Sequence, residues 1–327
     1  MTHQERIQAA MRGEPVDRAP IALWRHFPHD DATAEGFSRA VVDFQRKYDF
    51  DLVKVTPVAG YPAEAWGAEL IYADNDEGTR DYRSRPVNDR ADWSRLPILN
   101  PDEGVLGREL EALQRIRDAL GGDAPILETI FSPLTIAWNL SGDRWLEDLR
   151  HHPEDLHAGL KTIAETTTAF ARASVKTGAD GIFFATQLAT TDLLTEVEYR
   201  TFGVAYDRQV LDAITDEADP ILLHIHGVHI MFDLLADYPA GIVNWHDRRT
   251  EPTLADALAR VSGAVLGGLN EWDTLLHGSP DDVRAEIADA LAQTEGRRVI
   301  IGAGCVTPVT APEANLHAAR QAVEETG

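Results

Sequence analysis

The sequence predicts an α/β protein, a (β/α)8 barrel of the TIM type with an inserted hairpin after the second strand. Two observations predict this fold. About eight short apolar runs of strand length alternate with longer segments of helical periodicity, and a length of 327 residues suits one barrel domain spanning residues 1–327. An open doubly wound sheet is the alternative. No G-x-G-x-x-G motif follows the first strand, so nothing indicates dinucleotide binding.

The expected strands are bounded by glycine, proline and polar residues. They cover residues 20–24, 50–55, 125–130, 182–185, 221–226, 241–245, 263–267 and 298–302. Helices are expected over residues 2–12, 34–48, 105–120, 143–176, 193–217 and 228–235, with two more starting at Ser279 and near Thr310. Ser279 precedes a proline and two aspartates, and Thr310 and Glu313 have capping-box spacing, which are both signals of a helix N-terminus.

Residues 59–103 do not fit the repeat of a barrel. This stretch is rich in glycine and proline and holds short alternating pieces such as residues 68–72. We expect an inserted β-hairpin and an extended crossing that acts as a lid.

The composition limits the partners of the protein. A formal net charge of -24 excludes nucleic acid and anionic membrane surfaces, because both require a basic protein surface. No apolar run approaches the ~20 residues of a transmembrane helix, and residues 1–6 lack the apolar stretch of a signal peptide. We therefore expect a soluble cytoplasmic protein that acts on a small molecule. Its single cysteine, Cys305, cannot form an intrachain disulfide.

Two histidines lie two residues apart in the apolar run 221–226. On a strand, His224 and His226 share one face, while Leu223 and Ile225 share the other. This arrangement is typical of either a ligand pair or two hydrogen-bonded core histidines.

Other chemically active residues gather at the carboxyl ends of the expected strands, where barrel enzymes place their sites. They are Arg25, His26, Lys54, Glu128, Ser132, Gln187, His224, His226, Asn244, His246, Asn270 and Cys305. Three imidazoles and one thiol from this set suit Zn²⁺ better than a hard cation. The alternative is that His246 and Asp247 form a solvated pair and that Cys305 is a small buried apolar residue.

Three segments resemble the uroporphyrinogen decarboxylase superfamily, which includes the decarboxylase and zinc-dependent corrinoid and thiol methyltransferases. They are Arg12-Gly13-Glu14-Pro15-Val16-Asp17-Arg18-Ala19-Pro20, Asn244-Trp245, and Gly304-Cys305-Val306-Thr307-Pro308 with Ala314-Asn315-Leu316. The resemblance covers nearly the whole chain and implies the same barrel.

The decarboxylase branch is matched only in part. This chain keeps the first arginine of the loop after strand 1 as Arg25, but the second falls on His29. The positions of the family's catalytic aspartate, tyrosine, serine and histidine fall near Val58, Asn139, Gln187 and Ala303. Decarboxylation of uroporphyrinogen III, or of a related carboxylate in tetrapyrrole metabolism, is therefore kept as an alternative.

The methyltransferase branch is matched more closely. Its H-x-C strand and its later cysteine correspond to His224 and Cys305, while His226 replaces the second cysteine. The glutamate ligand of the related methionine synthases falls on His246. The resemblance implies a Zn²⁺ site and a corrinoid carried by a partner protein, and the change from thiolate to imidazole leaves the acceptor open.

We therefore expect a zinc-dependent methyltransferase, with a non-catalytic ligand-binding barrel as a further alternative. The expected metal ligands are His224, His226 and Cys305, with an open coordination position and His246 as a fourth candidate. Residues expected to orient the substrate are Glu128, Asn244 and Gln187, and those expected to bind it are Arg25, His26, His29 and Asn139.

Overall fold

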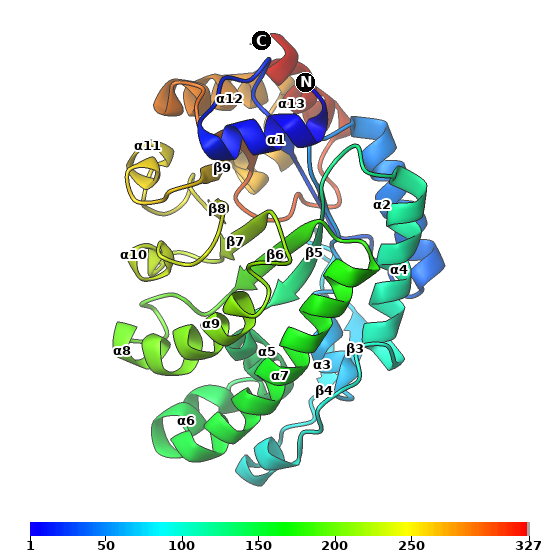
Figure 1. Ribbon diagram of the computed structural model, residues 1–327, viewed down its shortest axis with the longest axis vertical. Helices are drawn as coiled ribbons and strands as arrows, with labels where there is room; N and C mark the ends of the chain where they lie inside the picture. Colours follow the sequence, from blue (N-terminus) through cyan, green and yellow to red (C-terminus); the bar gives the residue numbers. More distant parts are fainter. Residues whose placement is uncertain (326–327) are drawn as a thin grey trace.

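A computed structural model describes residues 1–325 and contains a parallel sheet of eight strands surrounded by helices (Figure 1). The strand order is β1-β10-β9-β8-β7-β6-β5-β2. The backbone N–H of Asp51 donates to the carbonyl of Ile21 at 2.8 Å, so the two ends of the sheet meet and the sheet curls into a nearly closed barrel. The predicted barrel is confirmed.

Each barrel strand overlaps one of the expected strands in sequence. The bounds are β1 Ile21–Ala22, β2 Val53–Lys54, β5 Ile126–Phe131, β6 Gly181–Thr186, β7 Ile221–Ile225, β8 Ile242–Trp245, β9 Ala264–Leu269 and β10 Val299–Ala303. The two shortest strands, β1 and β2, are the edge strands of the sheet.

The helices follow the expected order with some changes of length. They are α1 His3–Arg12, α2 Ala34–Tyr48, α3 Tyr61–Ala65, α4 Gly104–Leu120, α5 Pro133–Ser141, α6 Arg144–His151, α7 Pro153–Thr177, α8 Glu196–Tyr199, α9 Ala205–Asp212, α10 Phe232–Leu235, α11 Leu254–Leu258, α12 Pro280–Thr294 and α13 Glu313–Glu325. A 3-10 turn covers Arg90–Arg95, and π-helical turns cover Arg200–Val204 and Glu271–Leu276. None of the helices within residues 1–325 has the length and apolar character needed to cross a membrane.

Helix α5 was not predicted, because it is apolar on nearly all sides and is buried, so no helical stripe stands out in its sequence. Its start has a local signal: the Ser132 hydroxyl accepts a hydrogen bond from the Thr135 N–H, and Pro133 follows. The helix expected over 228–235 is only the single turn α10. The helix expected over 193–217 is divided into α8, a π-helical turn and α9.

Of the two expected N-terminal signals, one is confirmed. The Ser279 hydroxyl accepts from the Asp282 N–H and completes a capping box at α12. The Thr310 prediction is wrong, because α13 begins at Glu313 and the Thr310 hydroxyl instead hydrogen-bonds to the Asp76 carboxylate.

The hairpin expected in the insertion is present as β3 (Glu69–Tyr72) paired antiparallel with β4 (Arg80–Ser84). Its turn is fastened to the loop after β10, because the Val309 N–H donates to the Asp76 carbonyl at 2.6 Å. Arg80 donates to the carbonyl of Pro28, in the loop after β1, at 2.8 Å. The hairpin therefore lies over the carboxyl ends of the barrel strands.

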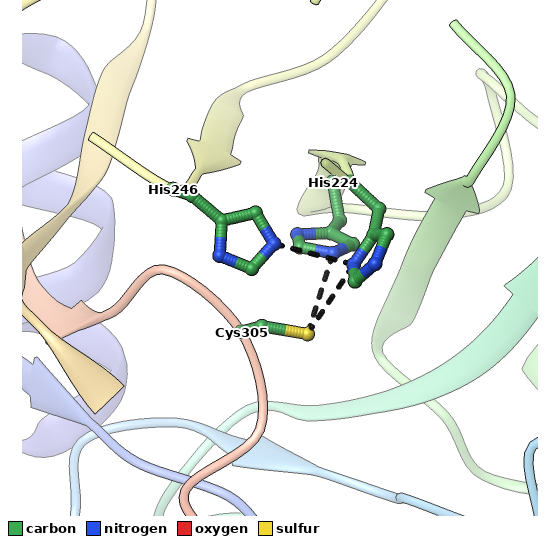
Figure 2. A group of neighbouring side chains, drawn as sticks. His224, His246 and Cys305 are labelled. Atoms are coloured by element: carbon green, nitrogen blue, oxygen red, sulfur yellow. Dashed lines mark hydrogen bonds between the residues drawn. The ribbon is translucent and has the colours of Figure 1, made fainter. Parts of the chain in front are cut away.

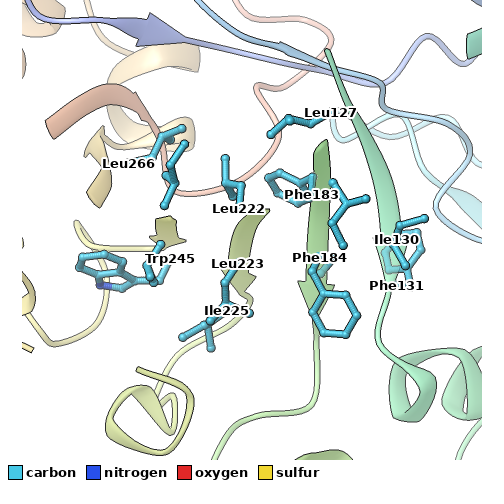
Figure 3. Packing of buried hydrophobic residues seen from close by; sticks show 14 of the residues in the cluster. Leu127, Ile130, Phe131, Phe183, Phe184, Leu222, Leu223, Ile225, Trp245 and Leu266 are labelled. Atoms are coloured by element: carbon cyan, nitrogen blue, oxygen red, sulfur yellow. The ribbon is translucent and has the colours of Figure 1, made fainter. Parts of the chain in front are cut away.

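The barrel core follows the strand alternation (Figure 3). Leu127, Phe183, Leu222 and Leu266 lie on the inner side of the sheet, and Leu223, Ile225 and Phe184 lie on the outer side, which the helices cover. All seven are buried. This alternation places His224 and His226 on the inner side with Leu222.

Candidate metal centre and substrate pocket

A cavity of about 500 Å³ opens among the loops that follow the barrel strands. Its lining includes the ends of β1, β2, β5, β6 and β7, the loops after β8, β9 and β10, and the β3–β4 hairpin. The site therefore lies at the end of the barrel where TIM-barrel enzymes carry their chemistry.

Four side chains on the cavity wall form a compact donor cluster (Figure 2). One donor atom from each of His224, His226, His246 and Cys305 lies within 4.8 Å of all the others. The Cys305 Sγ is 3.7 Å from both the Nε2 of His224 and the Nδ1 of His226. The Nε2 of His246 is 3.2 Å from the Nδ1 of His226. Strand β7 and the segments that directly follow β7, β8 and β10 thus bring three nitrogens and one sulfur to one point.

His224 is oriented by its neighbour on the next strand. The register of β7 and β8 sets His224 beside Asn244, and the Nδ1 of His224 lies 2.6 Å from the Oδ1 of Asn244. The Nδ2 of Asn244 donates to the carbonyls of Leu266 and Ala303, so its oxygen must face His224. His224 therefore carries its proton on Nδ1 and turns the lone pair of Nε2 toward Cys305.

His246 is oriented by a carboxylate. Its Nδ1 donates to the Oε1 of Glu271 at 2.7 Å, and Arg249 donates to the same oxygen at 3.1 Å. The Nε2 of His246 is left as an acceptor facing His226. A histidine held by a carboxylate through its far nitrogen is a common support for a metal ligand.

The loop that carries Cys305 approaches His246 closely because residue 304 is glycine. A Cβ at Gly304 would lie 2.7 Å from the Cα of His246 and 3.2 Å from the Oε2 of Glu271. No larger residue fits there without moving the loop, so the position of Cys305 depends on this contact.

Burial favours the neutral rings of His224 and His226, because it lowers the pKa of both. Burial, followed by the neighbouring His226 and His246, lowers the pKa of His224 well below its ordinary value. Burial, followed by the charge of Glu271, raises the pKa of the Cys305 thiol to about 12. Neutral imidazoles and a thiol that a cation can convert to thiolate are the donors that Zn²⁺ takes, so the donor set fits this ion.

The cavity also carries a group of cationic and donor side chains, which we call the cation group: Lys54, Arg80 and His26. Lys54 is 8% exposed and donates to the Thr56 hydroxyl at 3.2 Å, and it forms no ion pair with the part of the chain that the structure describes. Its Nζ lies 4.5 Å from the centre of the Phe183 ring.

The other two members have unused hydrogen-bonding atoms. The Nη1 of Arg80 and the Nδ1 of His26 are buried without a partner. Burial, followed by the charge of Lys54, lowers the pKa of His26 to about 3, and burial lowers the pKa of Lys54 to about 7. The Arg80 guanidinium pairs with the buried Asp31 carboxylate, whereas Lys54 has no acidic partner among the described residues, so Lys54 is the member of the group whose charge is uncompensated.

The structure brings seven of the eleven expected site residues onto the cavity wall. They are His26, Asn139, Gln187, His224, His226, His246 and Cys305. Asn244 lies behind His224, is bonded to His224 and to two backbone carbonyls, and does not line the cavity.

Arg25, His29 and Glu128 lie away from this cavity, contrary to expectation. Arg25 and His29 line a neighbouring cleft, where the Arg25 guanidinium packs 5.4 Å from the rings of Phe27 and Phe44. Glu128 is fully buried and is absent from the cavity lining. Its neighbour on β5, Thr129, lines the cavity, so alternation turns Glu128 outward toward α4.

Three important residues were given no role from the sequence: Lys54, Arg80 and Glu271. Lys54 had been noticed at a strand end, and Glu271 directly follows Asn270, so both could be found by tracing strand ends. Arg80 reaches the cavity from the inserted hairpin, for which the sequence gives no register relative to the barrel.

Comparison with known proteins decides the family. The model of the family described as uroporphyrinogen decarboxylase (URO-D) matches residues 2–326. The chain belongs to the uroporphyrinogen decarboxylase family. The resemblance read from the sequence motifs is thereby confirmed.

Relatives within this family include more than one enzyme. The methylcobamide:CoM methyltransferase MtbA of Methanosarcina mazei is 24% identical over 329 aligned positions, which cover 96% of this chain and 95% of the relative. The uroporphyrinogen decarboxylase of Cellvibrio japonicus is 29% identical over 347 positions, which cover 95% and 93% of the two chains.

Solved structures agree on the fold. A methyltransferase from Methanosarcina mazei superposes with a TM-score of 0.86 at 22% identity, covering 100% of this chain and 99% of the other. A B12-independent methionine synthase from Shewanella gives a TM-score of 0.63 at 13% identity, with 94% and 97% coverage. The solved structures thus show the same barrel fold.

Proposed function

We propose that this protein is a zinc-dependent methyltransferase that moves a methyl group from a corrinoid, carried by a partner protein, to a small anionic thiol. The observation that carries the proposal is the convergence of His224, His226, His246 and Cys305 on one point of the cavity wall. The similarity to methylcobamide:CoM methyltransferases over 96% of the chain supports the same reaction class.

The four clustered side chains would hold the ion. Zn²⁺ bound there would supply Lewis acidity, which lowers the pKa of a thiol and makes it nucleophilic at neutral pH. The chain itself fixes the ligand nitrogens: Asn244 holds His224, and Glu271 holds His246. These contacts prepare the donor atoms before a ligand arrives.

The cation group would hold the anionic end of the acceptor. A buried ammonium without a carboxylate partner is costly, and an anion in the cavity would remove that cost. Lys54 and Arg80 thus replace Arg25 as the residues expected to bind the anionic group. His26 remains a substrate-binding residue, as expected. Asn139 and Gln187 line the same cavity and would contact the rest of the substrate.

In the proposed reaction, the cobalt–carbon bond of the donor breaks and leaves its electron pair on cobalt, which passes from Co(III) to Co(I). A carbon–sulfur bond forms on the acceptor, and the proton of the thiol goes to the buffer. The test uses zinc-loaded protein with methylcobalamin and either 2-mercaptoethanesulfonate or uncharged 2-mercaptoethanol. Demethylation of the cobalamin is measured by the change in its absorbance. We expect it to be faster with the sulfonate than with 2-mercaptoethanol. Absence of demethylation with both thiols, in protein shown to contain zinc, would contradict the proposal.

Decarboxylation is the second candidate, favoured by the 29% identity to a uroporphyrinogen decarboxylase and by a cation group that would also suit carboxylates. The purified protein would then convert uroporphyrinogen to coproporphyrinogen without zinc. We expect no such conversion. A barrel without activity in either assay that still binds an anionic molecule would be a non-catalytic binding protein.

A further inference from the structure

The three histidines of the donor cluster are not held equally. His224 and His246 are each 3% exposed, whereas His226 is partly exposed on the cavity wall. The side chains of His224 and His246 are therefore fixed by surrounding protein on more sides than that of His226.

The hydrogen bonds of the far ring nitrogens show the same difference. The Nδ1 of His224 is bonded to Asn244, and the Nδ1 of His246 is bonded to Glu271. Within residues 1–325 the hydrogen-bond partners of the His226 ring all contact its Nδ1, the atom that faces the cluster, and none contacts its Nε2. A ligand without such support costs less to move, because no second hydrogen bond is broken.

Ring packing distinguishes His224 from the other two histidines. The His224 ring stacks on Phe183 with ring centres 5.3 Å apart. Among the residues the structure describes, His226 and His246 have ring contacts only with other histidines of the cluster. Movement of the His226 ring would therefore break no aromatic stack with a residue outside the cluster, and the bond to Glu271 is what holds His246 more firmly than His226.

The backbone after His226 has room beside it. Gly227 has a φ of +99°, and a Cβ built at this residue would meet no atom within 4 Å. His226 lies just after β7, which ends at Ile225, whereas His224 lies inside the strand. The His226 ring can therefore turn toward the cavity without a clash beside Gly227.

We infer that His226 is the exchangeable metal ligand of this protein, the one that leaves when a substrate donor binds. The inference rests on the proposed zinc site. It names the side chain whose departure would open a coordination position for the substrate. The exchange breaks one metal–nitrogen bond and forms one metal–donor bond, with no change in oxidation state; a thiol donor loses its proton to the buffer. His224, His246 and Cys305 stay as the permanent ligands.

This inference differs from the sequence-based view, in which His246 was the weaker, fourth ligand. The sequence position of His246 does not say how strongly it would bind a metal. Its hydrogen bond to Glu271, which Arg249 also contacts, indicates a firmly held ligand. The position that carries a second cysteine in related methyltransferases is thus occupied here by the least supported histidine.

The first test compares zinc affinity by chelator competition in His224→Ala, His246→Ala and His226→Ala, with His229→Ala as control. His229 lies three residues after His226 but is exposed and bonded to Asp192 outside the cluster. We expect His226→Ala to keep an affinity at least about tenfold higher than the other two ligand variants, the size of effect typical of ligand support. An affinity loss in His226→Ala equal to that in His224→Ala would overturn the inference.

The second test uses cobalt-substituted protein and 2-mercaptoethanol as the probe. If His226 leaves, wild-type protein keeps the intense visible bands of four-coordinate Co²⁺ while the sulfur-to-metal band, already present from Cys305, becomes more intense. If all four protein ligands stay, the visible bands weaken as a fifth ligand is added, and this result would overturn the inference. Wild-type protein without bound zinc would instead contradict the proposed function, so the two failures are distinguishable.

Discussion

Asn244 and His224 lie side by side on strands β8 and β7, with 2.6 Å between the amide oxygen and the Nδ1 of the ring. Two backbone carbonyls, of Leu266 and Ala303, take the amide protons and fix the direction of the amide. The strand pairing of the barrel therefore decides which nitrogen of His224 is free to bind a metal. Asn244 acts on the site through His224 and is a positioning residue.

Asn244→Ala should lower zinc affinity by about 10- to 100-fold, because the His224 ring loses the bond that sets its tautomer. The measurement is chelator competition at constant pH. Asn139→Ala is the matched control, since Asn139 lines the cavity but its hydrogen bond, from Arg85 to its backbone carbonyl, lies outside the cluster. Equal affinity in wild type and Asn244→Ala would show that the amide does not support the ligand.

Gly304→Ala should also weaken metal binding while the protein stays folded. The added methyl group would lie 2.7 Å from the Cα of His246, so the loop after β10 must shift and carry Cys305 with it. Gly122→Ala is the control, because a Cβ there meets only a flexible arginine end at 3.9 Å. Zinc affinity and circular dichroism would be compared, and an unchanged affinity in Gly304→Ala would mean that the loop adjusts without moving the thiol.

Lys54→Met should raise the KM for 2-mercaptoethanesulfonate by about 10- to 100-fold, the loss expected for a charge-assisted hydrogen bond of ~1.5–3 kcal/mol. The zinc content should not change, and activity with uncharged 2-mercaptoethanol should change much less. Lys47→Met is the control, because Lys47 pairs with Glu313 on the surface, away from the cavity. A similar rise in KM for both thiols would show that Lys54 does not bind the anionic group.

Asp51, which lies just before β2, is expected to stabilise the end of the barrel opposite the cavity. It is fully buried and accepts hydrogen bonds from Arg6 at 2.6 Å, Arg18 at 2.7 Å and His3 at 2.7 Å. Asp51→Asn would leave the two guanidinium groups short of a countercharge and should cost about 3–5 kcal/mol of unfolding free energy in urea titrations. Asp281→Asn, at an exposed position, should cost little.

The same residue gives a pH dependence. Burial alone would raise the pKa of Asp51, but the hydrogen bonds from His3 and Arg18 outweigh it and lower the pKa to about 2, from an ordinary value of 3.8. The stabilisation is therefore complete above pH 3.8 and is lost as the pH falls toward 2. The wild-type protein should lose more stability across this window than Asp51→Asn does, and parallel losses would contradict the assignment.

Much of the fold could be predicted from the sequence, because buried parallel strands leave short apolar runs between helices. The alternation on β7 predicted that His224 and His226 share one face and that Leu223 and Ile225 share the other, and the structure turns the two histidines to the cavity. Helix α5 escaped prediction because burial on all sides removes the amphipathic signal. The expected helix over 228–235 shrank because its first half, residues 228–231, is a loop that starts at the cavity wall with Val228.

The site was harder to predict than the fold. Residues at strand ends could be found, but whether a side chain faces the cavity depends on register, which separates Thr129 from Glu128. The role of Arg80 depends on how the hairpin lies over the barrel, and the role of Glu271 depends on a contact with His246 across two loops. Long-range contacts of this kind leave no local pattern in the sequence.

Metal analysis of the purified protein tests the central claim most directly. We expect about one zinc ion per chain in the wild type, as four-donor sites of this kind bind, and almost none in His224→Ala and Cys305→Ala, with circular dichroism showing that both variants remain folded. Wild-type protein that binds no zinc when supplied with it, or variants that keep the wild-type content, would contradict the claim that these side chains form a metal centre.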